Sequence, residues 1–332
     1  MQIVGLIFGL VTAWGHSVAY VLTRAYTVGG HGSPLQLLVR SHALIGVIAA
    51  LTLPGVVWWA GERLPGPGVI WLLPVLAAAG FATGQCCMFG ALRHTEASRA
   101  APPLSLKIPL LAVVTSFVLG PPLQARQWAA VGLAVAATAV LGGAGGRLPR
   151  AAVVRLAGAV VAYATTDTLI TRFLDQLKRP GDGPADAFMI ALAGFACIYT
   201  IAGLAAAVGL IRFGSRDLRA WRACLPYTAT WIVTTTALYA AFATLGVVFA
   251  NIVQSSRTLW SVVLGMILAR AGVTAVEART TGRVALQRLA AAALLFAAIV
   301  LFAWPTGSAT PAEPAPPPAE PPRAVQTDPK PD

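Results

Sequence analysis

Long apolar stretches alternate with short polar connections along nearly the whole chain. An α-helix needs about 20 consecutive apolar residues to cross a bilayer, and ten stretches of roughly that length are present. They cover residues 3–24, 36–59, 69–92, 100–120, 127–144, 152–174, 187–211, 225–244, 247–269 and 284–304. The pattern therefore predicts an all-α integral membrane protein with ten transmembrane helices.

Composition supports this prediction and narrows the class of protein. The 332 residues are 57% hydrophobic and only 11% charged, whereas about a quarter of the residues in a typical soluble protein are charged. The net charge of +12 comes mainly from arginine, which in a membrane protein normally lies in loops and sets the orientation of the helices. We therefore expect contact with a lipid bilayer and no binding of nucleic acid.

A glycine-rich connection after the fifth apolar stretch divides the chain into two halves. Each half has an odd number of helices, so a duplicated half enters the membrane in the opposite sense, as in transporters built from inverted five-helix repeats. The expected units are a first repeat at residues 1–144, a linker at 145–150 and a second repeat at 151–304. The composition then changes to Pro, Ala, Glu and Thr, which predicts a disordered Pro-rich tail at 305–332.

The ninth apolar stretch carries polar residues although it is long enough to span a bilayer. Asn251 and Gln254 share one helix face, with Arg257 on its flank, and polar side chains in hydrocarbon are costly unless they face a bundle interior or a wet cavity. Lys107 stands 150 positions before Arg257, in the matching segment of the first half. We expect both cations to flank a central cavity and to bind an anionic group of a substrate. The alternative is a structural cation near a helix end.

Asp167 is the only acidic residue well inside an apolar stretch. A lone carboxylate within the membrane is a candidate site for proton exchange and hence for coupling to a proton gradient. The alternative is a static ion pair, for which the basic candidates are Arg24, Arg40, Lys107 and Arg257. The sequence leaves both interpretations open.

Other candidate residues lie on polar or aromatic helix faces. His16 in the first segment could bind substrate or relay protons, although a membrane histidine is as often simply hydrogen-bonded across helices. Arg40 and His42, near the start of the second segment, are expected to be interfacial anchors. The candidate substrate-binding residues are Arg257, Lys107, Asn251, Gln254, His16, Trp231, Tyr239, Gln85 and Trp260, with Asp167 as the proton-coupling candidate.

No cofactor and no metal is expected. The chain has no GxxxxGK[ST] loop, no GxGxxG after a strand and no HExxH motif, and no nucleophile and base are combined in a catalytic pattern. Its four cysteines lack CxxC spacing and are expected to be buried, inert thiols: Cys86, Cys87, Cys197 and Cys224. The sequence therefore argues against an enzyme.

Several features resemble the bacterial EamA-type members of the drug/metabolite transporter superfamily. The first features are Trp14-Gly15 followed by Arg24 in the first segment, and Arg40 in the second. The third feature is Ala91–Gly142, which resembles the family's short loop, Pro-containing fourth helix, tight turn and Gly-containing fifth helix. The QSSR run of the ninth segment resembles the corresponding element of the second half. The chain departs from the family at Gly120-Pro121-Pro122, where members often carry a Gly-Glu pair.

The resemblance covers about residues 1–304 and implies a ten-helix carrier in the bacterial inner membrane. The expected function is secondary active transport of a small polar metabolite, either amino acid-like or an organic anion, by alternating access. The resemblance implies export, and Asp167 is the candidate for proton coupling. The alternatives are a non-transporting membrane assembly or sensor protein and a membrane enzyme acting on lipid-linked substrates. The sequence indicates no oligomeric state.

Overall fold

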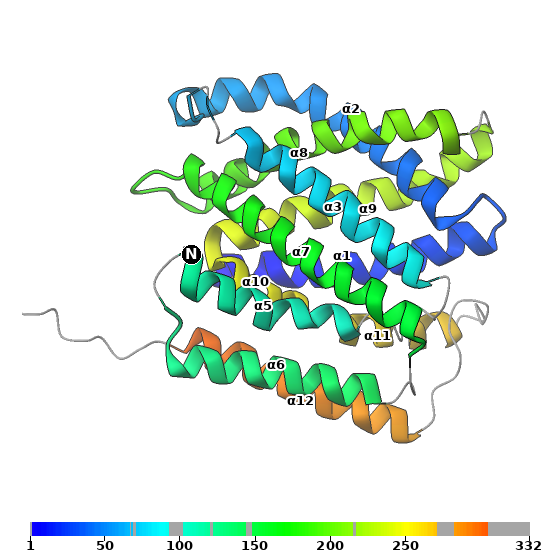
Figure 1. Cartoon of the computed structure of the whole chain (residues 1–332), viewed down its shortest axis with the longest axis vertical. Coiled ribbons are helices and arrows are strands. Elements are labelled where there is room, and N and C mark those ends of the chain that lie inside the picture. The colour runs from blue at the N-terminus through cyan, green and yellow to red at the C-terminus, as the bar shows by residue number, and fades with distance from the viewer. Residues whose placement is uncertain are drawn as a thin grey trace, which may run out of the picture. The chain divides into compact units, whose positions relative to one another are not determined.

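The computed structural model describes residues 2–66, 68, 71–92, 102–119, 122–143, 148–214, 217–270 and 282–304, and these residues form helices and turns without any strand (Figure 1). Residues Met1–Phe302 form one packed unit. The predicted Pro-rich tail at 305–332 lies outside the described residues, as does most of the predicted linker. The all-α prediction is confirmed for the described part of the chain.

Six helices among the described residues are long and apolar enough to cross a membrane. In the first half they are α1 (Gln2–Val28), α2 (Pro34–Ala60), which runs on into the short 3-10 helix η1 (Gly61–Arg63), and α3 (Leu72–Leu92). In the second half they are α7 (Arg150–Leu177), α8 (Pro184–Phe213) and α9 (Leu218–Leu245). Each half also has a final helix, α6 (Ala125–Gly143) and α12 (Gly282–Ala303).

Two of the predicted spans are interrupted rather than continuous. The span predicted at 100–120 consists of the 3-10 segment η3 (Pro102–Leu106), α5 (Lys107–Val114) and the π-helical turn η4 (Thr115–Leu119). The span predicted at 247–269 consists of α10 (Val247–Gln254) and α11 (Arg257–Arg270), separated by a turn. Prolines lack the amide hydrogen that a regular helix needs, which accounts for the first interruption. At the second, the Ser255 hydroxyl donates to the Ile252 carbonyl and competes with the backbone.

Proline and capping side chains define where α2 and α8 begin. Pro34 is in the first turn of α2, where its missing amide hydrogen costs nothing, and Ser33 and Gln36 form a reciprocal capping box. Pro184 occupies the same place in α8, and Asp186 accepts a hydrogen bond from the Gly183 amide at 2.9 Å. Both helices therefore have well-defined starts before a long apolar run.

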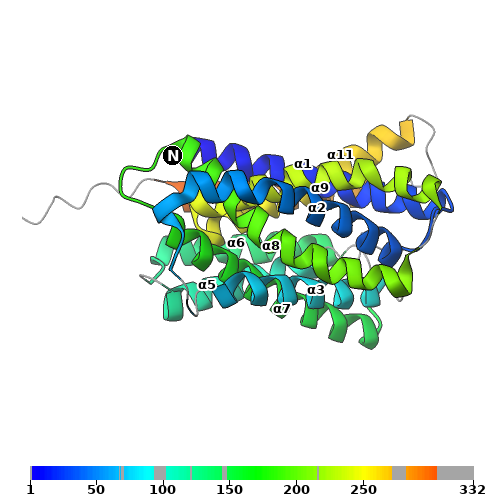
Figure 2. The same ribbon diagram turned by 90° about the horizontal axis from the view of Figure 1, so that it is seen from above.

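The long helices pack mainly in pairs taken from the two halves. α2 packs along α8, α3 along α7 and α1 along α9. Figure 2 shows α1, α2 and α9 on one side of this unit and α3, α5, α6 and α7 on the other. The interrupted segments lie between them, since α10 contacts α1, α5 and α9, and α5 contacts α6 and α7.

Small residues allow these helices to approach closely. A Cβ added to Gly9 of α1 would lie 2.7 Å from the Val253 side chain of α10, and one added to Gly5 would overlap Thr244 of α9. The Gly5–Gly9 spacing is the small-xxx-small pattern common at membrane helix contacts. At the crossing of α2 and α8 the backbones themselves meet, because a Cβ on Gly46 would overlap the Cα of Gly203 and the reverse also holds. This crossing has no room for a side chain.

The substitution Gly203→Ala should therefore destabilise the protein. The added methyl group has only backbone to displace, and overpacking of this kind costs about 1–3 kcal/mol. Thermal unfolding of the purified protein in detergent measures the effect as a lowered Tm. Gly55→Ala is the matched control, because nothing lies within 4 Å of its added Cβ, and its Tm should stay the same or rise. Equal Tm values for both variants would show that the crossing is not tightly packed.

Candidate functional site

A buried ion pair stands at the centre of the helix unit. Lys107 Nζ lies 2.9 Å from Asp167 Oδ2, and the side chains are only 9% and 8% exposed. Asn251 Nδ2 donates to the same carboxylate oxygen at 3.0 Å. The three residues come from α5, α7 and α10, so one carboxylate ties both interrupted segments to a continuous helix. Of the two interpretations of Asp167, the structure shows an ion pair with Lys107.

Asn251 is fixed by a second bond within its own helix. Its Nδ2 also donates to the Val247 carbonyl at 2.9 Å, whereas its Oδ1 is buried without a hydrogen-bond partner among the described residues. A buried acceptor without a partner is unfavourable by about 1–3 kcal/mol. The amide thus offers one free acceptor beside the ion pair.

Arg257 begins α11 directly after the helix interruption. Its backbone carbonyl accepts a 2.6 Å hydrogen bond from Ser17 of α1, and Ser261 donates to the same serine hydroxyl at 3.2 Å. The residue is only 7% exposed, and within the described part of the chain its guanidinium forms no hydrogen bond and no ion pair. It is close enough to interact electrostatically with His16, Lys107 and Tyr163.

The buried charges of this cluster do not balance. Lys107 and Arg257 are cations, whereas Asp167, which pairs with Lys107, is the one carboxylate of the cluster in the described structure. Arg40 is buried as well, but it lies nearer the α1–α2 connection and donates to the Tyr26 hydroxyl and the His31 carbonyl. An uncompensated charge in a low-dielectric interior is strongly unfavourable. The arrangement can accept one further negative charge beside Arg257.

Aromatic side chains continue the site from His16. The rings of His16 and Trp231 meet edge to face with centroids 5.4 Å apart. Trp231 Nε1 donates to the Tyr199 hydroxyl at 2.9 Å, and the Tyr199 and Tyr239 ring centroids are 6.5 Å apart. His42 completes the group, since its ring contacts those of Phe81, Tyr199 and Trp231. The charged cluster thus adjoins a set of aromatic and imidazole rings from α1, α2, α3, α8 and α9.

Most residues singled out from the sequence meet in this region. Lys107, Asp167 and Asn251 are bonded together, and Arg257, His16, Trp231 and Tyr239 follow through electrostatic or ring contacts. Gln254 and Gln85 are buried, and Trp260 is half-buried. No hydrogen bond among the described residues joins any of these last three to the cluster, so the structure does not bring them into it.

Three residues of this region were not among the sequence candidates: His42, Phe81 and Tyr199. His42 was expected to be an interfacial anchor, which is wrong, because it is only 3% exposed and surrounded by rings. The sequence placed His42 near the start of the predicted second helix, where anchors are common. In the structure α2 begins at Pro34, so His42 lies more than two turns inside the helix. Phe81 and Tyr199 had no signal in the sequence, because aromatic residues are ordinary in apolar helices.

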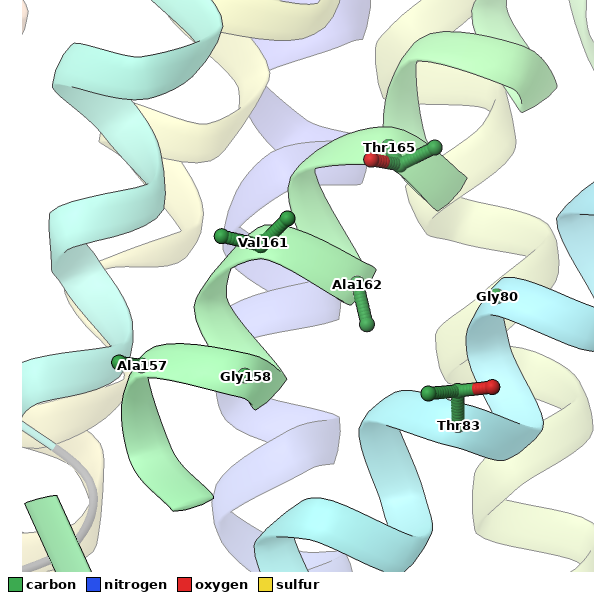
Figure 3. Close-up of a pocket in the computed structure, with 7 residues that line it drawn as sticks. All are labelled: Gly80, Thr83, Ala157, Gly158, Val161, Ala162 and Thr165. Carbon is green, nitrogen blue, oxygen red and sulfur yellow. The ribbon is translucent and has the colours of Figure 1, made fainter. Parts of the chain in front are cut away.

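A groove on another face of the unit lies between α3 and α7. Its volume is about 550 Å³, and its lining is small and mostly apolar, as Figure 3 shows: Gly80, Thr83, Ala157, Gly158, Val161, Ala162 and Thr165. Thr83, Ala157, Val161 and Thr165 are exposed. None of the charged cluster lines it, so the groove is a separate feature of a helix face expected to meet lipid.

The cysteines carry no site chemistry in this arrangement. All four thiols are free, with Cys197 and Cys224 buried. The expectation of burial is wrong for Cys86, which is exposed on α3, and only in part right for Cys87.

Comparison with solved structures supports a shared fold. No curated protein matches the chain significantly. Among solved structures 29 chains match, and one described as "Crystal structure of protein" has a TM-score of 0.59 at 18% sequence identity. That match covers 90% of this chain and 95% of the other. At such low identity the likeness concerns the fold alone.

Residues 3–143 match the EamA-like transporter family. The matched region runs from α1 to the end of α6 and contains Lys107. The match and the six long apolar helices agree in describing a multi-pass membrane protein whose ligand is a small molecule. The first half of the chain is thus similar to the EamA-type transporters of the drug/metabolite transporter superfamily.

Proposed function

We propose that this protein is a secondary active carrier, not an enzyme, which moves a small polar metabolite with an anionic group across the bacterial inner membrane by alternating access. The substrate is an amino acid-like molecule or an organic anion, and export is the direction that the family implies. The carrier has ten helical segments in two inverted repeats of five. The observation that carries the proposal is the buried guanidinium of Arg257, which has no ion pair or hydrogen bond among the described residues.

The pairing of helices supports the inverted repeat. If each helix of the first half corresponds to one of the second, α1 corresponds to α7, α2 to α8 and α3 to α9. Exchanging the halves then turns the α1–α9 pair into the α7–α3 pair and returns the α2–α8 pair to itself. These are the three main pairs of long helices. A two-fold relation between the repeats explains all of them at once.

Helix starts support the same correspondence. Pro34 and Pro184, which open α2 and α8, are 150 positions apart, and so are Lys107 and Arg257, which open α5 and α11. If the two halves were unrelated, the same spacing of 150 positions would not be expected at two different helix starts. The two cations are therefore counterparts in the proposed repeat.

Both cations also stand at interruptions of their spans. In transporters of this type, substrates bind near the middle of the membrane, where discontinuous helices expose backbone groups and helix N-termini face anionic substrate groups. The N-terminus of α11 and the guanidinium of Arg257 would act on an anion together. Lys107 is already paired with Asp167, so we assign the substrate's anionic group to Arg257.

The carboxylate of Asp167 is our candidate for proton coupling. It bonds to residues of both interrupted segments, Lys107 and Asn251, so a change in its charge would alter contacts between the two halves. Protonation would weaken the ion pair and release α5 from α7. A two-state rearrangement of this kind is what coupling a proton to a carrier requires.

Replacing Arg257 by glutamine should weaken anion binding without destabilising the fold. We expect the affinity for an anionic ligand to fall about 10- to 100-fold, because charge-assisted hydrogen bonds contribute about 1.5–3 kcal/mol. The Tm of the ligand-free variant should equal or exceed that of the wild type, since an uncompensated buried charge has been removed.

A thermal-shift screen with amino acids, organic acids and sugar phosphates measures both effects, because a ligand stabilises the state it binds. Arg222→Gln, which removes an exposed arginine from α9, is the matched control and should bind like the wild type. Identical ligand shifts in wild type and Arg257→Gln would remove the site from Arg257. A wild type that responds to no anion would refute the proposed function.

The buried ion pair gives a second prediction. Lys107→Met and Asp167→Asn should each lower the Tm strongly, because breaking a buried pair leaves one partner uncompensated and costs about 3–5 kcal/mol. The double variant should recover most of the loss. In proteoliposomes it should still exchange labelled substrate for unlabelled substrate but no longer accumulate it in response to a pH gradient. Gradient-driven accumulation by the double variant would exclude Asp167 as the coupling site.

A further inference from the structure

Two buried histidines are held in the same orientation. His16 Nδ1 lies 2.9 Å from the Thr12 carbonyl oxygen, and His42 Nδ1 lies 2.9 Å from the Leu38 carbonyl oxygen. A carbonyl oxygen only accepts, so each Nδ1 carries the hydrogen. In the neutral imidazole, Nε2 then has a lone pair and accepts a hydrogen bond.

The hydroxyl beside His42 does not change this assignment. Ser41 Oγ lies 3.2 Å from His42 Nδ1, but it also donates to the Leu38 carbonyl at 3.0 Å. If His42 Nδ1 lacked a hydrogen, its lone pair would face the carbonyl lone pairs of Leu38 at 2.9 Å. The protonated Nδ1 is the arrangement that fits both distances.

Neither Nε2 atom receives a hydrogen bond within the described part of the chain. Nε2 of His42 is fully buried there, and His16 as a residue is only 9% exposed. Two polar groups on the rings around His42 are already engaged, because the Trp231 indole N–H bonds to the Tyr199 hydroxyl and that hydroxyl lies 3.3 Å from the Thr235 hydroxyl. An unpaired buried acceptor is unfavourable. This buried acceptor, and a second imidazole held in the same orientation against the same Trp231 ring, point to a ligand that donates hydrogen bonds.

The surroundings define the chemistry of that donor. Both imidazoles contact the ring of Trp231, with centroid separations of 5.4 Å for His16 and 5.7 Å for His42. Phe81 and Tyr199 also contact His42. Aromatic faces attract ammonium groups as well as apolar ones. Because Arg257 interacts electrostatically with His16, the donor end of a ligand would lie beside its anionic end.

We propose that His16 and His42 form a subsite for an N–H donor, such as the α-ammonium group of a substrate whose carboxylate binds Arg257. The proposal rests on the proposed function, because it takes Arg257 as the anion site. It adds that the carrier selects zwitterions over simple organic anions. His16 and His42 thereby determine specificity through their Nε2 atoms.

The role of each nitrogen can be tested separately. Asparagine keeps a donor in the position of Nδ1 and removes Nε2, and Asn251 already makes such a bond to the carbonyl four residues before it. Glutamine places a polar acceptor near Nε2 and gives up the Nδ1 bond. A merely structural histidine would therefore tolerate Asn better than Gln, whereas a ligand-binding histidine would tolerate Gln better.

The experiment measures dissociation constants for carboxylates with and without the ammonium group. The pairs are L-leucine and 4-methylpentanoate, L-phenylalanine and 3-phenylpropanoate, and L-glutamate and glutarate. We expect the wild type to bind at least one amino acid about tenfold more tightly than its deaminated partner. His16→Asn and His42→Asn should lose this preference and still bind the deaminated acid as the wild type does. The Gln variants should keep most of it.

Three results would overturn the proposal, and they differ in what else they affect. If the wild type binds both members of every pair equally, or prefers the deaminated acid, the subsite is wrong and the anion site at Arg257 stands. If the Asn variants keep the preference, or lose it no more than the Gln variants, the histidines are structural. If no member of any pair binds the wild type, both the proposed function and the subsite fall.

Discussion

Burying charge inside an apolar helix unit is the constraint on which the arrangement of this protein depends. Lys107 and Asp167 satisfy it together, and Asn251 adds a third bond to the same carboxylate. These bonds require α5, α7 and α10 to meet at one place, and that fixes where the interrupted segments lie between the long helices. Arg257 stands beside this pair without a carboxylate partner among the described residues, so the same constraint makes it the proposed site for a bound anion.

The interruptions follow from the same requirement. A continuous helix satisfies all its backbone groups, and irregular backbone within a membrane is tolerated only where protein or water satisfies the exposed groups. At the turn before Arg257, the backbone amides of Ser255 and Ser256 donate to the Asn251 and Val253 carbonyls. Serine hydroxyls add to these bonds, because Ser255 donates to the Ile252 carbonyl and Ser17 of α1 donates to the Arg257 carbonyl. The polar residues of the ninth span therefore contribute to the shape of the backbone.

Sequence reasoning succeeded where a residue is costly in its predicted surroundings. Charged and amide groups in apolar stretches stand out, and this identified Lys107, Asp167, Asn251 and Arg257, which the structure gathers in one cluster. Phe81 and Tyr199 could not be identified in this way, because the sequence does not distinguish an aromatic residue that faces a site from one that faces lipid. It also could not predict the pairing of α2 with α8, which depends on two glycines far apart in the sequence, Gly46 and Gly203.

Charge balance links the roles proposed for Arg257 and Asp167. With Asp167 ionised, the two cations and one anion leave a single positive charge, which one bound carboxylate neutralises. Protonation of Asp167 leaves two positive charges and strengthens the binding of an anion, and by reciprocity a bound anion favours protonation. With the roles proposed for these two residues, proton and ligand would assist each other's binding at this cluster and would move in the same direction.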